Sequence, residues 1–222
     1  MSHLTVNRAS RWPLALLLVL GALPLLPAVG RMLVRFVDMG APPEMLADTS
    51  RFFVMPVPLV VHVICGCLFT LLGALQFSGA LRRGPWHRRS GRILVAAGVL
   101  AAITALWLTQ FYPHAGTEGP LLYWFRLAAG TGMLVLLLAG VQAARQRRFA
   151  AHRACMMYAY ALGLGASTQM LIGIPWLLLF GEPSPVVSDL LLGAGWVINL
   201  AVAQWALQRG GTPGARQAIA AA

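Results

Sequence analysis

Six long apolar stretches divide the chain, and short segments with Arg, Asp, Glu, Pro or Gly separate them. They cover residues 12–30, 52–77, 93–112, 121–142, 154–180 and 190–207. A helix needs about 20 apolar residues to cross a bilayer, and no stretch alternates as a membrane strand would. The pattern predicts an all-α bundle of six transmembrane helices. Residues 1–222 then form a single membrane domain, with 210–222 as a loose tail.

Arginines in the short connections predict the orientation, because basic residues remain on the cytoplasmic side of a membrane. Two connections, between stretches two and three and between stretches four and five, carry most of them, and others lie near both ends of the chain. These are Arg82, Arg83, Arg88, Arg89 and Arg92, then Arg145, Arg147, Arg148 and Arg153, and finally Arg8, Arg11, Arg209 and Arg216. Both termini are therefore expected in the cytoplasm, which agrees with an even number of spans.

The first stretch allows a second interpretation. Arg8 and Arg11, a Leu-rich run and then Ala28-Val29-Gly30 also fit a cleaved secretory signal. Its length of 19 residues, from 12 to 30, favours a retained helix.

Composition places the chain in a membrane. It is 59% hydrophobic and 10% charged, whereas about a quarter of the residues of a soluble domain are charged. The net charge of +11 would suggest nucleic-acid binding if the basic residues shared a hydrated face. Thirteen of the seventeen arginines instead fall on the predicted inner side, so no nucleic-acid partner is expected. These connections suit anionic lipid headgroups, and the expected location is the bacterial inner membrane.

Few residues remain to carry chemistry. No phosphate-binding loop, nucleophile elbow or metalloprotease signature occurs, so a hydrolase or transferase is the least favoured class. All six acids fall in connections assigned to the outside, which predicts a membrane interior without carboxylates. They are Asp38, Glu44, Asp48, Glu118, Glu182 and Asp189.

Pro85 suits the first turn of a helix, so His87 is expected in the first turn of the third helix, and His152 just before the fifth stretch is placed similarly. The two histidines then lie at the same predicted depth, which suits the two axial ligands of a b-type haem. Arg88, Arg92 and Arg153 lie beside them, where they would bind the haem propionates. The alternative is that both histidines are solvated among lipid phosphates.

Two ionisable residues lie deeper. His62 is ten residues past Phe52, about 15 Å along a helix, and Arg126 is five residues into the fourth stretch. An ionisable group at such a depth is a functional candidate. Arg126 either extends outward or binds an anionic group such as a propionate, a lipid or a substrate, and His62 is either a site residue or a packed interface residue. His114 would pair with His62 at a second haem only if its loop dips inward.

The order of these residues resembles the bacterial membrane proteins of domain-of-unknown-function family 2306. The resemblance covers about residues 60–207. Its motifs are His62-x-x-x-Gly66, Gly73-x-x-Gln76-Phe77, Arg82-Arg83, His87-Arg88-x-x-Gly91-Arg92 and His152-Arg153-x-x-Met156. Cys155 and Tyr158 stand where the family tends to have an aromatic and a basic residue. The resemblance implies a membrane protein and no particular activity.

The layout is also similar to six-helix di-haem cytochromes b, in histidine order only. The first functional hypothesis is therefore haem b at His87 and His152, with His62 and His114 as a further pair, moving electrons to or from a quinone. The alternative is a small-molecule permease, or an accessory subunit of a larger membrane complex. A water-filled cavity that reaches both His62 and Arg126 would favour transport.

Overall fold

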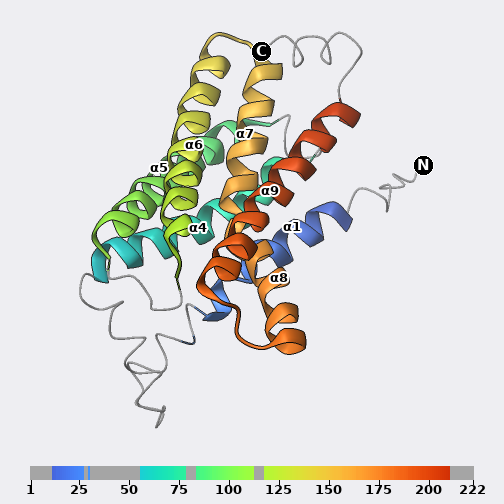
Figure 1. Cartoon of the computed structure of the whole chain (residues 1–222). Helices are drawn as coiled ribbons and strands as arrows, with labels where there is room; N and C mark the ends of the chain where they lie inside the picture. The colour runs from blue at the N-terminus through green and yellow to red at the C-terminus, as the bar shows by residue number, and fades with distance from the viewer. Residues whose placement is uncertain (1–11, 28–29, 31–55, 79–83, 113–117, 211–222) are drawn as a thin grey trace.

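The computed structural model describes residues 12–27, 30, 56–78, 84–112 and 118–210, and within these ranges all regular structure is helical (Figure 1). Among the described residues, four helices are long and apolar enough to cross a membrane, and a bent pair provides a fifth possible span. The chain is therefore a multi-pass helical membrane protein. The helices are α1 (Trp12–Ala22), α4 (Pro56–Gln76), α5 (Pro85–Phe111), α6 (Pro120–Arg145), α7 (Phe149–Gly163), α8 (Gly165–Phe180) and α9 (Pro185–Gly210).

The first predicted span is described only in part. Over residues 12–30 the structure describes an apolar helical segment, Pro13–Pro27, that is too short to count among the candidate spans. The sixth span and the cytoplasmic placement of both termini therefore stay predictions. The tail from residue 211 lies outside the described residues.

Proline sets where the long helices begin. Pro56, Pro85, Pro120 and Pro185 are the first residues of α4, α5, α6 and α9. Proline suits the first turn because its missing N–H has no partner there and its φ is already helical. Two helices therefore begin before their apolar stretches at about residues 93 and 190: α5 begins at Pro85, where its proline predicts a first turn, and α9 begins at Pro185.

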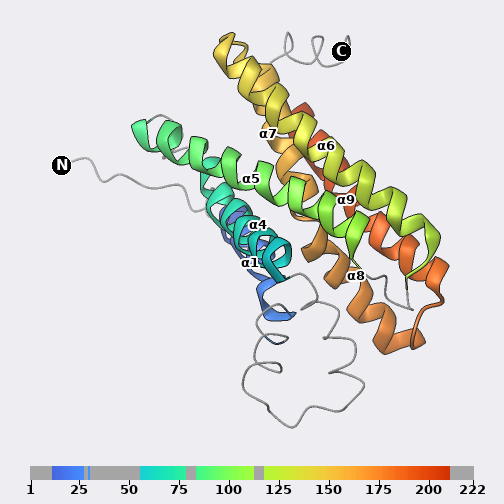
Figure 2. The same cartoon turned by 90° about the vertical axis from the view of Figure 1, so that its left-hand side faces the viewer.

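The bundle is built from helix pairs. α4 packs on α5, α6 on α7, and α8 on α9, while α5 also contacts α6 and α1 lies along α4 (Figures 1 and 2). α7 packs mainly on α6 and α9 and less closely on α4. Arg88, Arg89 and Arg92 lie near the start of α5, and Arg145, Arg147 and Arg148 lie at the end of α6.

The buried core lies where α4, α5, α6 and α7 meet. Phe69 and Tyr160 are 6% and 5% exposed and pack ring against ring, with centroids 6.0 Å apart. The Tyr160 hydroxyl donates to the Thr70 carbonyl at 2.7 Å, so its polar end is satisfied. Gly98 lets α5 lie close to α4 and α6. A methyl group at this position would lie 2.8 Å from the Phe69 ring on α4 and 2.9 Å from Leu137 on α6. Small residues thus permit close helix contact.

The predicted helix 154–180 is two helices. α7 and α8 meet at Leu164 with a bend of 41°. Phe69 packs against Gly163, and the Trp196 indole packs against Gly165, positions where any side chain would collide. Asn199 on α9 donates to the Ala161 carbonyl at 3.1 Å. A neighbouring helix therefore satisfies backbone that the break would leave unpaired, as burial in a membrane requires.

Candidate functional site

A cavity of about 530 Å³ lies between the helices on the side of the molecule where α5 ends and α6 begins. Its wall is mostly apolar, with Leu59, Phe69, Met133 and Leu162 among the lining residues. The bend between α7 and α8 forms part of this wall, because Leu162, Gly163 and Ala166 lie on it. The volume falls within the range of pockets for drug-sized ligands.

His62 lines the cavity from α4. Its Nδ1 lies 2.9 Å from the Ala101 carbonyl oxygen, across the α4–α5 contact. A carbonyl only accepts, so Nδ1 carries the proton and donates. In the neutral form of the ring, Nε2 then keeps a lone pair for a donor or a metal.

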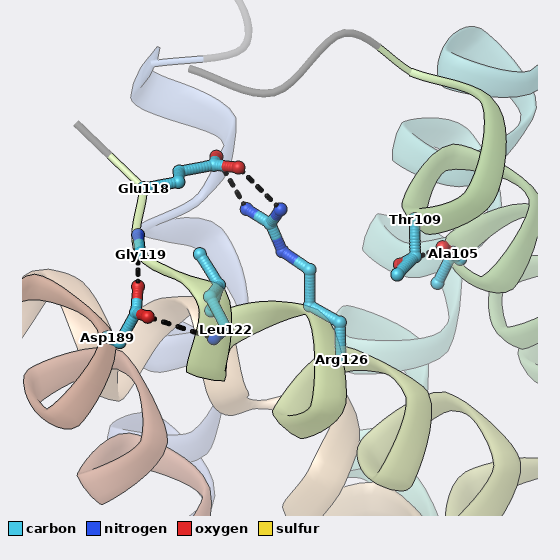
Figure 3. A network of polar contacts seen from close by, with 7 residues as sticks. All are labelled: Ala105, Thr109, Glu118, Gly119, Leu122, Arg126 and Asp189. Carbon is cyan, nitrogen blue, oxygen red and sulfur yellow. Dashed lines mark hydrogen bonds and ion pairs between the residues drawn. The ribbon is translucent and has the colours of Figure 1, made fainter. Parts of the chain in front are cut away.

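Arg126 lines the cavity from α6, and its guanidinium binds the Glu118 carboxylate (Figure 3). Two of its nitrogens donate to the two Glu118 oxygens, each at 2.9 Å. Glu118 also lines the cavity. The side chains are 36% and 14% exposed, so the pair is partly shielded from solvent. The sequence places Glu118 in a connection, and the structure makes it the partner of the Arg126 guanidinium.

Asp189 ties α9 to the start of α6 (Figure 3). Its carboxylate accepts hydrogen bonds from the backbone N–H groups of Gly119, Leu121 and Leu122, at 2.9, 2.9 and 3.0 Å. These N–H groups lack partners within their own helix, and the helix dipole favours a negative charge there. Asp189 is 0% exposed. The sequence places Asp189 in a connection, whereas α9 begins at Pro185 and includes this residue in its second turn.

His87 and His152 lie on helices that are not a closely packed pair. His87 is in the first turn of α5, as predicted, and His152 is near the start of α7. In Figure 2 the start of α5 lies well apart from the connection between α6 and α7. The Nδ1 of His152 donates to the Gly140 carbonyl at 2.9 Å. The residues that the structure does bring to one cavity are His62 and Arg126.

The other predicted site residues are dispersed. Arg88 and Arg92 are exposed on α5, and Arg153 is half-buried on α7. His114 lies outside the described residues. Among the residues that the structure describes, no three His, Cys, Asp or Glu side chains gather as a metal site would need.

Glu118, Gln169 and Trp196 are among the cavity residues that were not predicted as a site. Glu118 lies eight positions before Arg126, and an acid so close to a lone membrane arginine was the available signal. Gln169 was interpreted as a residue joining helices, and its Nε2 does donate to the Leu192 carbonyl at 2.8 Å. Trp196 carried no signal, since tryptophans are common throughout this chain.

The comparisons identify the family. The profile of the family described as "Predicted membrane protein (DUF2306)" matches residues 59–207. Searches of curated proteins and of solved structures found no significant match. The matched region contains α5 to α8 in full and most of α4 and α9, and with them every described residue that lines the cavity. The chain belongs to the DUF2306 family of membrane proteins.

Proposed function

We propose that this protein binds a small amphipathic molecule inside the membrane, as a permease or binding protein of the bacterial inner membrane. The observation that carries the proposal is the cavity that His62, Glu118 and Arg126 share. The distribution of arginines predicts that this cavity opens toward the outer half of the bilayer.

The wall of the cavity suits a molecule with a polar head and an apolar body. Aliphatic and aromatic side chains make up most of it, and a few polar groups fix orientation, as in known ligand sites. Arg126 uses two of its five N–H donors on Glu118, so three remain. The Nε2 lone pair of His62 accepts a hydrogen bond. A head with both an acceptor and a hydroxyl or amine donor matches these groups.

The broken helix supports transport in particular. Discontinuous membrane helices form substrate sites in many transporters, because the break places backbone and half-helix ends at the ligand. Here the break between α7 and α8 lies in the cavity wall. The proposal therefore assigns the bend at Leu164 to the binding site.

Photoaffinity labelling tests the proposal. The full chain in phosphatidylcholine nanodiscs is labelled with a decyl glycerol ether that carries a diazirine, with and without excess unlabelled ether. We expect labelling of Met133 and Leu162 in the cavity to fall severalfold with competitor. Leu178 and Val197, which are 79% and 66% exposed, should be labelled without saturation. Equal competition at all four residues would contradict the proposal.

Haem-dependent electron transfer is a second proposal. His62 and His152 each donate Nδ1–H to a backbone carbonyl, at 2.9 Å in both cases. This arrangement leaves Nε2 as the lone-pair nitrogen, and metal-ligating histidines are oriented in the same way. Each residue therefore fits as one imidazole ligand of a haem b, His152 in the predicted pair with His87 and His62 in the predicted further pair with His114, with a quinone as a redox partner. A bound haem would supply one-electron chemistry.

An absorbance spectrum tests this second proposal. Chain expressed with ample haem and then reduced should show a Soret band and an α-band, and His62→Ala or His152→Ala should weaken both bands. A colourless wild-type protein would rule the proposal out.

A further inference from the structure

We infer that the ligand of the cavity is an anionic amphiphile, and that it binds to Arg126 together with one proton that Glu118 takes up. The inference rests on the proposed function, since it names the ligand class and the control of the same cavity. Its basis is the ion pair between Arg126 and Glu118 in the cavity wall (Figure 3). Arg126 keeps its positive charge when an anion binds, whereas Glu118 can take up a proton.

Arg126 is the anion site. Among the described residues that line the cavity it carries the permanent positive charge, since arginine is not deprotonated in proteins. Its planar guanidinium binds a carboxylate, sulfate or phosphate through parallel N–H donors, as it binds Glu118 here. A ligand anion can take the remaining donors or displace Glu118. Either way the anion meets the carboxylate that already neutralises the arginine.

Charge balance then requires the proton. With Glu118 ionised, the pair is neutral, and an added anion leaves a net charge of minus one in a partly shielded, largely apolar cavity. Uncompensated charge in such a place is strongly unfavourable. If a carboxylate oxygen of Glu118 takes up a proton, Arg126 and the ligand anion form the neutral pair instead. One anion and one proton enter together, and no net charge moves.

Among the described residues, the other titratable groups around Glu118 already have partners. On α4, the Nδ1 proton of His62 is committed to Ala101, and the Glu118→Gln variant below distinguishes proton uptake at Nε2 from uptake at Glu118. Tyr112, at the end of α5, lines the cavity and has its own partner. On α9, Asp189 is held by three backbone N–H groups of the segment that carries Glu118. The lining residues from α7 and α8, among them Gln169, are uncharged.

Two probes of equal chain length test the inference, decyl sulfate and decyl glycerol ether, because neither titrates between pH 5 and pH 8. Binding is measured on wild-type, Glu118→Gln and Arg126→Gln chains in phosphatidylcholine nanodiscs. For wild type we expect affinity for decyl sulfate to rise up to tenfold per unit fall in pH, the limit for uptake of one proton. Glu118→Gln should bind the sulfate with no pH dependence and at least tenfold more tightly than wild type at pH 8. Arg126→Gln should lose at least tenfold in the ratio of sulfate to ether affinity.

The outcomes separate the two proposals. If neither probe binds saturably to wild type, the proposed function fails. If the ether binds but wild-type affinity for the sulfate is independent of pH, the inference alone is overturned. The same holds if pH dependence persists in Glu118→Gln, which would assign it to His62. Displacement of decyl sulfate by an equal concentration of inorganic sulfate would also overturn it, because the ligand would then be a soluble anion.

Discussion

Replacing Asp189 with alanine is expected to lower the free energy of unfolding by about 3–5 kcal/mol, the cost of removing one partner from a buried charged contact. Three backbone N–H groups at the start of α6 would lose their acceptor at once. Alanine leaves no oxygen in a place that is 0% exposed. Each unsatisfied buried donor costs about 1–3 kcal/mol.

The measurement is the midpoint of reversible unfolding by sodium dodecyl sulfate in mixed micelles. Asp189→Asn keeps one acceptor oxygen and should lose less than half as much stability. Glu182→Ala removes an exposed acid from the connection before α9 and serves as the matched control. An Asp189→Ala midpoint equal to that of Glu182→Ala would show that Asp189 does not stabilise this helix contact.

The long helices could be predicted because a membrane leaves little choice. Every backbone N–H and C=O in an apolar stretch must pair within the stretch, so the runs that became α4, α5, α6 and α9 had to be helical. Their starts were harder to predict. Prolines were interpreted mainly as breaks, although Pro120 and Pro185 each begin a helix.

The break between α7 and α8 could not be predicted from the residues on either side of it. Gly163 and Gly165 also fit a continuous helix with a close neighbour, and the proline within α8, Pro175, lies away from the break. What allows the bend is distant in sequence: Phe69 and Trp196 occupy the space beside the two glycines. Asn199 satisfies a carbonyl next to the break. Contacts between helices determine this feature.

The candidate site was predicted in part. The rule that buried ionisable groups are functional candidates selected His62 and Arg126, and both line the cavity. His87 and His152 were proposed as haem ligands because they lie at the same predicted depth in the membrane. Depth along a helix, however, says nothing about which helices are neighbours. The role of Asp189 depends on N–H groups 67 to 70 residues away, which no local pattern encodes.

Filling the cavity tests the central claim most directly. Ala129 lines the cavity, whereas its neighbour Ala128 is exposed and does not, so Ala129→Phe and Ala128→Phe form a matched pair on α6. A phenyl group would displace about three methylene groups of a bound amphiphile, each contributing about 0.8 kcal/mol. We expect Ala129→Phe to weaken binding of decyl glycerol ether about 50-fold.

The decisive measurement is equilibrium binding of radiolabelled decyl glycerol ether to the wild type and both variants in nanodiscs, corrected with empty discs. The account predicts one saturable site per chain in the wild type, the same site in Ala128→Phe, and the large loss in Ala129→Phe alone. Equal binding by the two variants, or no saturable binding by the wild type, would contradict it.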